Sequence, residues 1–185
     1  MDTTSLWNAC TAFHGHQCGG LAIGFQAALY AAHLLELPLG NALSPDEEIV
    51  CVTEHDACGV DGVQVVLGCT AGKGNLIFHL RGKQAFTFYR RDTGAAVRLV
   101  LRPRPEGLTR QQALDYYRTA NPTDLFDVKP PLIPLPHRAS LHENRDCFLC
   151  GESVATPWLA QWQGRPVCLD CLEKKANPAV SMVRP

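Results

Sequence analysis

Residues 49–67 read IVCVTEHDACGVDGVQVVL, and this stretch places a strand and a helix side by side around a polar segment. Its first six residues are rich in β-branched side chains, which predicts a strand over 49–54. Val60, Gln64 and Leu67 recur at helical spacing, which predicts a helix over 61–67 that ends at Gly68. The polar segment between the two elements holds Glu54, His55, Asp56 and Cys58, so candidate functional side chains lie where the strand ends.

Further elements are predicted on both sides of this stretch. Upstream, a short helix precedes a glycine-containing loop at 14–20, and a helix rich in small residues follows from Leu21 to near Glu36. Downstream, Gly82-Lys83 predicts a hairpin turn between two strands, and Thr109 is the predicted N-cap of a later helix. The ranges are a helix at 5–13, strands at 76–80, 84–89 and 97–101, and a helix at 109–119.

Four prolines in residues 127–136 predict an extended segment without regular strand pairing. This segment divides the chain into a core domain at 1–126, an arm or linker at 127–144, and a small module at 145–185.

Composition excludes some classes of function. The 185 residues carry a net charge of −1, and residues 137–185 hold 6 basic and 5 acidic side chains, so neither part has the basic face of a nucleic-acid-binding protein. The most apolar stretch, 22–35, is too short to span a bilayer. The N-terminal residues lack the pattern of a secretory signal, and clustered cysteines in such a chain favour metal binding or catalysis over disulfides. We therefore expect a cytoplasmic protein.

Cys147, Cys150, Cys168 and Cys171 follow the spacing C-x2-C-x17-C-x2-C, which is a strong zinc pattern. Each CxxC places two thiolates on one turn, and two such turns complete a closed tetrahedron. Four thiolates leave no open position, so the predicted zinc is structural and the module is a zinc ribbon or treble clef. A rubredoxin-like iron site and four unrelated reduced cysteines are the alternatives.

A second group of candidate ligands surrounds residues 14–18 and 58–73. His14, His16 and Cys18 alternate, so in an extended segment their side chains point the same way, and imidazole and thiolate suit transition metals. Cys18 also precedes a helix, whose positive end favours a thiolate. We expect His16, Cys18 and Cys58 to hold a metal with an open position, and His14 is either a further ligand or a partner that orients His16.

Asp61 and Lys73 complete this hypothesis. Asp61 orients a ligand or acts as a base, and Lys73, among the glycines of GCTAGKGN, contacts an anionic substrate group. The predicted catalytic residues are therefore Cys18, Cys58, Asp61 and Lys73. The competing interpretation is that cysteines and histidines are buried as packing residues, which we prefer for Cys10, His33, Cys51 and His79.

The chain resembles the FmdE family, which takes its name from a component of formylmethanofuran dehydrogenase. The resemblance rests on FHGHQCGGLAIGFQAAL, ACGVDGVQVVLGCTAGKGNLIFHLRGKQAFTFY and the CFLCGE…CLDC segment, in this order along nearly the whole chain. Gly19 stands where the family usually has proline. The resemblance implies an α+β fold, with a mixed helix and antiparallel-sheet core and the zinc module attached, and a homodimer. It also implies a pocket lined by His14, His16, Cys18, Cys58, Asp61 and Cys69.

Three functions follow as hypotheses. The first is a metalloprotein with a structural zinc and a second transition metal in an enzyme-type pocket, acting on a small molecule in one-carbon or redox chemistry. The second is a non-enzymatic metal-binding or assembly subunit of a molybdenum or tungsten enzyme. A zinc-ribbon nucleic-acid regulator is the third, and the flat charge balance disfavours it.

Overall fold

The computed structural model describes residues 2–37 and 44–176, and it divides the chain into two compact units, Met1–Ala139 and Ser140–Pro185. The end of the predicted C-terminal module, residues 177–185, lies outside the described part. No helix among the described residues is long and apolar enough to cross a membrane.

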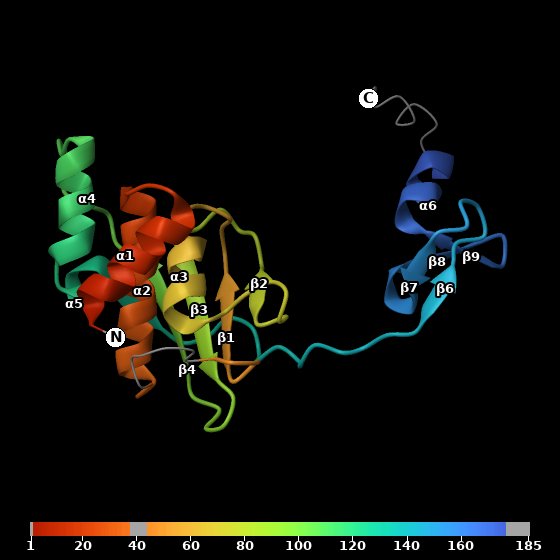
Figure 1. Cartoon of the computed structure of the whole chain (residues 1–185), viewed down its shortest axis with the longest axis horizontal. Helices are drawn as coiled ribbons and strands as arrows, with labels where there is room; N and C mark the ends of the chain where they lie inside the picture. The colour runs from red at the N-terminus through yellow and green to blue at the C-terminus, as the bar shows by residue number, and fades with distance from the viewer. Residues whose placement is uncertain (1, 38–43, 177–185) are drawn as a thin grey trace. The chain divides into compact units, whose positions relative to one another are not determined.

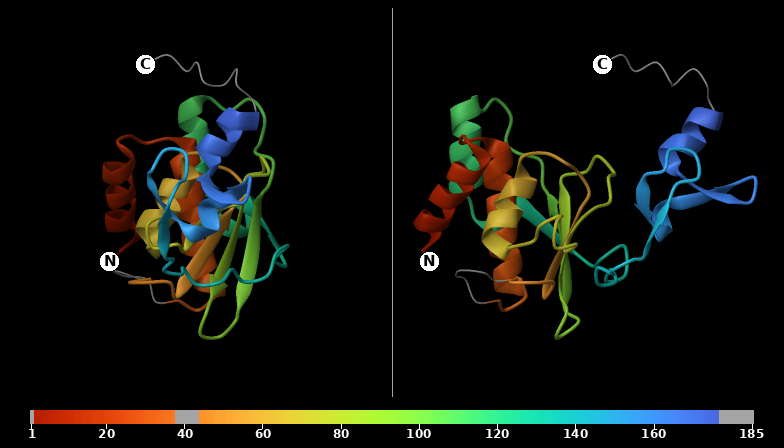
Figure 2. Two further views of the ribbon diagram at one scale, coloured as in Figure 1. Left: turned by 90° about the vertical axis from the view of Figure 1, so that its right-hand side faces the viewer. Right: turned by 45° about the vertical axis from the view of Figure 1, so that its right-hand side comes forward.

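The helices of the first unit gather on one side of its sheet (Figure 1), and Figure 2 shows this layering from a second direction. They are α1 (Thr3–His14), α2 (Gly19–Leu34), α3 (Gly59–Leu67), α4 (Arg110–Thr119) and the short α5 (Pro122–Leu125). The predicted N-cap of α4 is confirmed, because the Thr109 hydroxyl accepts from the Gln112 N–H and the Gln112 side chain accepts from the Thr109 N–H. The sequence did not predict α5.

Five strands form the sheet in the order β2-β1-β3-β4-β5. Their bounds are β1 (Ile49–Thr53), β2 (Leu76–Phe78), β3 (Ala85–Arg90), β4 (Ala96–Leu101) and β5 (Phe126–Lys129). Three neighbouring pairs are antiparallel and β1–β2 is parallel. Helices packed on a mostly antiparallel sheet make this unit an α+β fold, as expected.

The predicted hairpin at Gly82-Lys83 is wrong. Strands β2 and β3 do not pair with each other, because β1 lies between them and pairs with both. The turn residues suggested a hairpin, but β1 is buried on both faces and needs a partner at each edge.

The proline-containing segment also differs from expectation at its start. Residues 126–129 form β5 and pair with β4, so strand pairing continues into the segment predicted to lack it. Further along, Ile133 and Leu135 pack against Val50, Val52 and Tyr89 on the face of the sheet opposite the helices. The Tyr89 hydroxyl donates to the Ile133 carbonyl at 2.7 Å, which attaches the segment to the sheet.

Helices α2 and α3 approach each other through glycines. A Cβ at Gly24 would lie 1.7 Å from the Gly59 carbonyl oxygen, and one at Gly62 would lie 2.6 Å from the Phe25 nitrogen. Only a side chain of hydrogen permits backbones to approach this closely. The contact aligns the first turns of α2 and α3, and therefore brings Cys18 and Cys58 to the same place.

A buried ion pair crosses the sheet from the end of β1 to β4. Arg98 donates from Nε to Glu54 Oε1 at 2.5 Å and from Nη2 to Oε2 at 2.9 Å, and both residues are buried. These hydrogen bonds hold the pKa of Glu54 below its usual value. Because the folded-state pKa is lowered, the pair stabilises the fold above the ordinary carboxyl pKa of about 4.3, and this contribution is lost as the pH falls below it.

We expect Glu54→Gln to lower the free energy of unfolding by about 1.5–3 kcal/mol at pH 7, because it leaves the Arg98 guanidinium buried without its charged acceptor. The difference between variant and wild type should shrink as the pH is lowered from 6 to 3.5 in urea unfolding experiments. Glu106→Gln, on an exposed loop, is the control with no expected effect. An unchanged difference across this pH range would contradict the account.

The second unit is small. It contains two two-stranded sheets, β6 (Asn144–Asp146) with β7 (Ser153–Ala155) and β8 (Leu159–Trp162) with β9 (Arg165–Cys168), followed by α6 (Leu169–Ala176). Among its described residues, the buried core consists of Cys147, Val167 and Cys168. So small a core stabilises little structure without a cross-link or a metal.

Candidate metal sites

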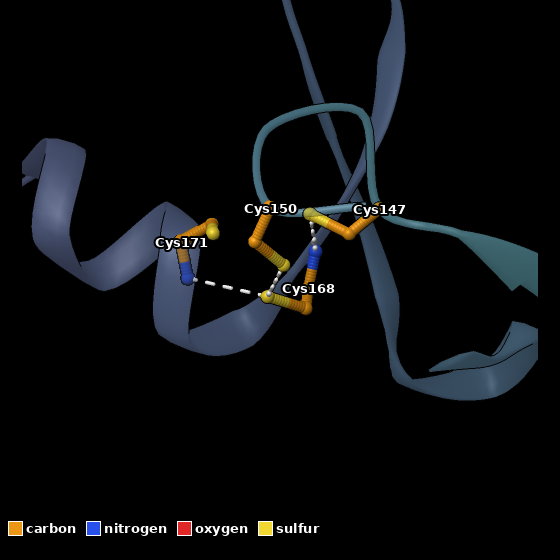
Figure 3. Close-up of side chains that lie close together, drawn as sticks. All are labelled: Cys147, Cys150, Cys168 and Cys171. Atoms are coloured by element: carbon orange, nitrogen blue, oxygen red, sulfur yellow. Dashed lines mark hydrogen bonds between the residues drawn. The ribbon is translucent and has the colours of Figure 1, made fainter. Parts of the chain in front are cut away.

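The four cysteines of the second unit converge on one point (Figure 3). Cys147 and Cys150 lie on the loop after β6, and Cys168 and Cys171 lie where β9 meets α6. Their Sγ atoms all lie within 4.8 Å of one another, so the group can hold a metal ion. Thiolates bound to tetrahedral zinc at about 2.3 Å would be about 3.8 Å apart. The distance between Cys150 Sγ and Cys168 Sγ is 3.9 Å, which fits this geometry.

Backbone amides stabilise negative charge in this group. The Cys168 N–H donates to Cys147 Sγ at 3.3 Å, and the Cys171 N–H donates to Cys168 Sγ at 3.4 Å. The first of these bonds lowers the pKa of Cys147 to about 6. By contrast, a hydrogen bond between the side chains of Cys171 and Cys168, followed by burial, raises the pKa of the Cys171 thiol to about 12. The Cys147 thiolate therefore forms readily, whereas deprotonation of Cys171 is opposed by the sulfur atoms around it. A cation is needed to hold all four cysteines deprotonated.

A second group lies in the first unit and comprises His14, Cys18 and Cys58, whose ligand atoms also lie within 4.8 Å of one another. His14 ends α1, Cys18 is the N-cap of α2, and Cys58 is the N-cap of α3, so three helix ends meet here. Cys18 Sγ accepts from the Leu21 N–H at 3.3 Å, which holds the sulfur at the first turn of α2. The site therefore depends on the packing of three helices rather than on one loop.

His14 is held in a defined orientation. Its Nδ1 lies 2.7 Å from Asp61 Oδ2, while its Nε2 faces Cys18 Sγ at 3.7 Å. The other oxygen of Asp61 accepts from Gln64 Nε2 at 3.1 Å. A carboxylate on one imidazole nitrogen fixes the ring so that the other nitrogen is free to bind a metal. Nitrogen and sulfur ligands of one zinc would be about 3.6 Å apart, and the His14–Cys18 distance fits that value.

His16 does not join this group in the described part of the chain. Gly15 has φ 87° and caps α1, so residues 14–18 turn instead of running extended, and the predicted alternation of side chains fails. The exposed His16 ring lies 4.4 Å from the His14 ring, centroid to centroid. Of the residues predicted for this site, His14 therefore faces the thiols and Asp61 contacts its ring, whereas His16 lies outside the ligand group.

Burial first, and then the neighbouring Cys18 and Asp61, raise the pKa of Cys58. Two thiols and a carboxylate crowded at one point disfavour further negative charge. The donor set thus suits a divalent soft cation, which would relieve the repulsion and hold both thiolates.

Lys73 and Cys69 are not brought to this group. They follow the C-terminal end of α3, about 13 Å of helix away from Cys58. Lys73 Nζ donates to the Ser44 carbonyl at 2.5 Å, and so it binds the loop before β1. Burial raises the pKa of Cys69 to about 12, and its thiol donates to the Ile49 carbonyl, so it packs in the core. Cys10 and Cys51 are likewise buried.

The sequence predicted Gln64 only as part of the helical pattern of residues 61–67. Its role follows from Asp61, because residues three apart share one helix face and Gln64 can then donate to the carboxylate. The spacing Cys58-x2-Asp61-x2-Gln64 was the available signal.

Fold and sites together define an α+β protein with a small four-cysteine unit and a second group of metal-type ligands. The chain belongs to the FmdE family, described as "FmdE, Molybdenum formylmethanofuran dehydrogenase operon", whose model matches residues 13–126. The matched region contains the His14, Cys18 and Cys58 group and excludes the four-cysteine unit.

Two similar proteins extend the comparison. A probable S-adenosyl-L-methionine-binding protein of Archaeoglobus fulgidus is 38% identical over 87 residues, which are 47% of this chain and 24% of that protein. The chain thus spans about a quarter of the length of this relative. The crystal structure of a tungsten formylmethanofuran dehydrogenase FmdE-like protein from Syntrophus aciditrophicus matches with a TM-score of 0.66 and 24% identity, over 93% of this chain and 92% of that one. At this identity the likeness shows the fold alone.

Proposed function

We propose that this protein is a metalloprotein in which His14, Cys18 and Cys58 bind a transition metal and leave one position open. The observation that carries the proposal is the pairing of His14 Nδ1 with Asp61, which aims Nε2 at the two thiols. Three protein ligands with an open fourth position are typical of catalytic sites, whereas structural sites are closed. The proposed metal would supply a polarising centre for a bound small molecule.

The chain's own residues have separate tasks in this proposal. Asp61 orients the imidazole of His14 by accepting a hydrogen bond from Nδ1, and Gln64 donates a hydrogen bond to Asp61. The exposed His16 ring lies 4.4 Å from the His14 ring, between the ligand group and solvent, where it would contact a bound molecule. One-carbon and redox chemistry remain the reaction classes that the sequence suggested.

The four-cysteine group is proposed to bind zinc as a structural ion. Its four thiolates close the tetrahedron and leave no position for a substrate. The domain boundaries at 126 and 144, the cytoplasmic location and the homodimer remain predictions from the sequence.

A second candidate is a non-enzymatic protein that assists a molybdenum or tungsten enzyme. The description of the family as belonging to a molybdenum formylmethanofuran dehydrogenase operon favours it. In that case the protein would co-purify with such an enzyme, and its metal would be transferred rather than retained.

Metal content tests the proposal directly. We expect two metal ions per wild-type chain and one in His14→Ala or Cys18→Ser, because each substitution removes one of three ligands. Asp61→Asn should keep the ligands but weaken binding of the N-terminal metal by about 10- to 100-fold. Elemental analysis with anomalous scattering at both sites would measure number and identity.

His33→Ala is the matched histidine control, since His33 is exposed in the last turn of α2. It should retain two ions, and His16→Ala should also retain two. One ion in both the wild type and Cys18→Ser would refute the N-terminal site. Loss of the ion in His16→Ala but not in His14→Ala would reassign the ligand.

A further inference from the structure

An open hollow of about 380 Å³ adjoins the N-terminal ligand group. Its lining residues include Gly19 and Gly20, which are the first residues of α2, and Arg104, Arg110 and Tyr117. Because glycine has no side chain, the hollow reaches the backbone at the start of α2.

Gly20 connects this hollow to the thiols. A Cβ placed on it would lie 3.1 Å from Cys58 Cβ, 3.7 Å from Cys58 Sγ and 3.8 Å from Cys18 Sγ. On the other side, a Cβ on Gly19 would lie 3.3 Å from the Tyr117 ring. The two glycines therefore form a thin wall with the ligand group behind it and α4 in front.

The hollow is lined by two arginines and by no acidic residue. Across the residues that the structure describes, Arg104 and Arg110 form no ion pair, whereas Arg98 and Arg102 each pair with a carboxylate. Arg104 lies near enough to Tyr117 for its charge to offset part of the rise that burial causes in the pKa of the Tyr117 phenol. Two guanidinium groups facing one hollow without counter-charge attract an anion.

The start of α2 adds backbone N–H donors, whose partial positive charge also favours an anion. The first N–H groups of a helix have no acceptor within it, and the Leu21 N–H is already taken by Cys18 Sγ. The remaining amides of Gly19 and Gly20 are at the wall of the hollow and lie at the positive end of a 16-residue helix.

We propose that this hollow binds the anionic group, a carboxylate or a phosphate, of a small-molecule substrate, and that Arg104 and Arg110 hold it beside the Cys18–Cys58 pair. The proposal rests on the proposed function and adds its substrate class. A molecule anchored there by its anionic end would place its remaining atoms next to the metal-type ligands. This proposal assigns anion binding to Arg104 and Arg110 in place of Lys73, whose Nζ donates to the Ser44 carbonyl.

The test compares an anionic with a neutral reagent of nearly the same size. Full-length protein as purified is treated with iodoacetate or iodoacetamide, and alkylation rates at Cys18 and Cys58 are read by peptide mass spectrometry. We expect the iodoacetate rate to saturate with concentration, as binding before reaction requires. The ratio of the iodoacetate rate to the iodoacetamide rate should fall roughly five- to tenfold in Arg104→Ala/Arg110→Ala, because two charge contacts are lost.

Arg102→Ala is the matched control, because Arg102 lies two residues from Arg104 but pairs with Asp127. Its ratio should equal that of the wild type, and Arg104→Lys/Arg110→Lys should retain most of the preference for iodoacetate. Equal ratios in wild type, double alanine variant and control would overturn the proposal. Circular dichroism melting establishes that the variants are folded.

Competitors distinguish the two kinds of anionic group. Inorganic phosphate that slows iodoacetate more than acetate does supports a phosphate ligand, and the reverse supports a carboxylate. Protection by neither overturns the site. Metal content of the same samples separates the two proposals. If the double alanine variant lowers the rate ratio but the wild type holds one metal per chain, the anion site is retained and the N-terminal metal is rejected. If the wild type holds two metals per chain but the double alanine variant leaves the ratio unchanged, the N-terminal metal is retained and the anion site is rejected.

Discussion

Removal of the zinc proposed for the four-cysteine group, by chelation or by Cys171→Ser, is expected to unfold residues 140–176 and leave the first unit folded. The physical reason is the small core of the second unit, in which two of the three buried side chains, Cys147 and Cys168, are themselves ligands. Structural zinc in such units contributes about 10–16 kcal/mol at neutral pH, which far exceeds what one buried valine can offer.

Without the metal, little holds the four thiols together. The crowded Cys171 thiol, with its pKa raised to about 12, would be protonated at neutral pH, and the hydrogen bonds among the four sulfurs are weak. Lowering the pH should have the same effect, because protons compete with the metal for the thiolates.

Fluorescence and hydrogen exchange can follow the two units separately. Trp158 and Trp162 belong to the second unit and Trp7 to the first, where it is buried against Phe25. Chelation should remove amide protection from β6 to α6 only. Cys18→Ser is the reciprocal control, since it should leave protection of the second unit intact. Persistent protection of residues 140–176 after complete chelation would contradict the prediction.

Gly24→Ala is expected to lower the free energy of unfolding of the first unit by at least about 3 kcal/mol and to release the metal proposed for the N-terminal group. An alanine in a helix interior normally gains about 1 kcal/mol over glycine, so propensity alone predicts the opposite sign. The steric clash outweighs this gain and makes the substitution destabilising, because the new Cβ would lie 1.7 Å from the Gly59 oxygen and 2.5 Å from Gly59 Cα, both backbone atoms.

Relief of this clash requires α2 and α3 to separate. Such a movement would carry Cys58, at the start of α3, away from Cys18 and His14, so loss of metal should accompany loss of stability. Gly72→Ala is the control, since a Cβ there meets no atom within 4 Å. Urea unfolding and metal content of both variants measure the effect, and a Gly24→Ala protein as stable as the wild type would show that the helices do not pack as described.

Much of the local structure could be read from the sequence because local chemistry specifies it. Thr109 begins α4 through its own hydroxyl, and the apolar spacing marked α2 and α3. The pairing of strands could not be read in this way. A glycine turn indicated a hairpin after β2, but the free energy of burying β1 between two neighbours decided the order of the sheet.

The two candidate metal sites differ in the same way in how far the sequence predicts them. In the four-cysteine group, each CxxC places its two sulfurs locally, so spacing alone predicted which residues converge. In the N-terminal group, His14 and Cys18 are only four residues apart, but Cys58 is far from both in sequence and begins another helix, so one end of α2 and one end of α3 must meet. Close contact between Gly24 and Gly59 brings those ends together, and the turn at Gly15 selects His14 over His16. Short-range geometry, including the turn at Gly15, was therefore determined by the sequence itself, while the approach of Cys58 to His14 and Cys18 and the charged hollow beside them depended on how the helices pack.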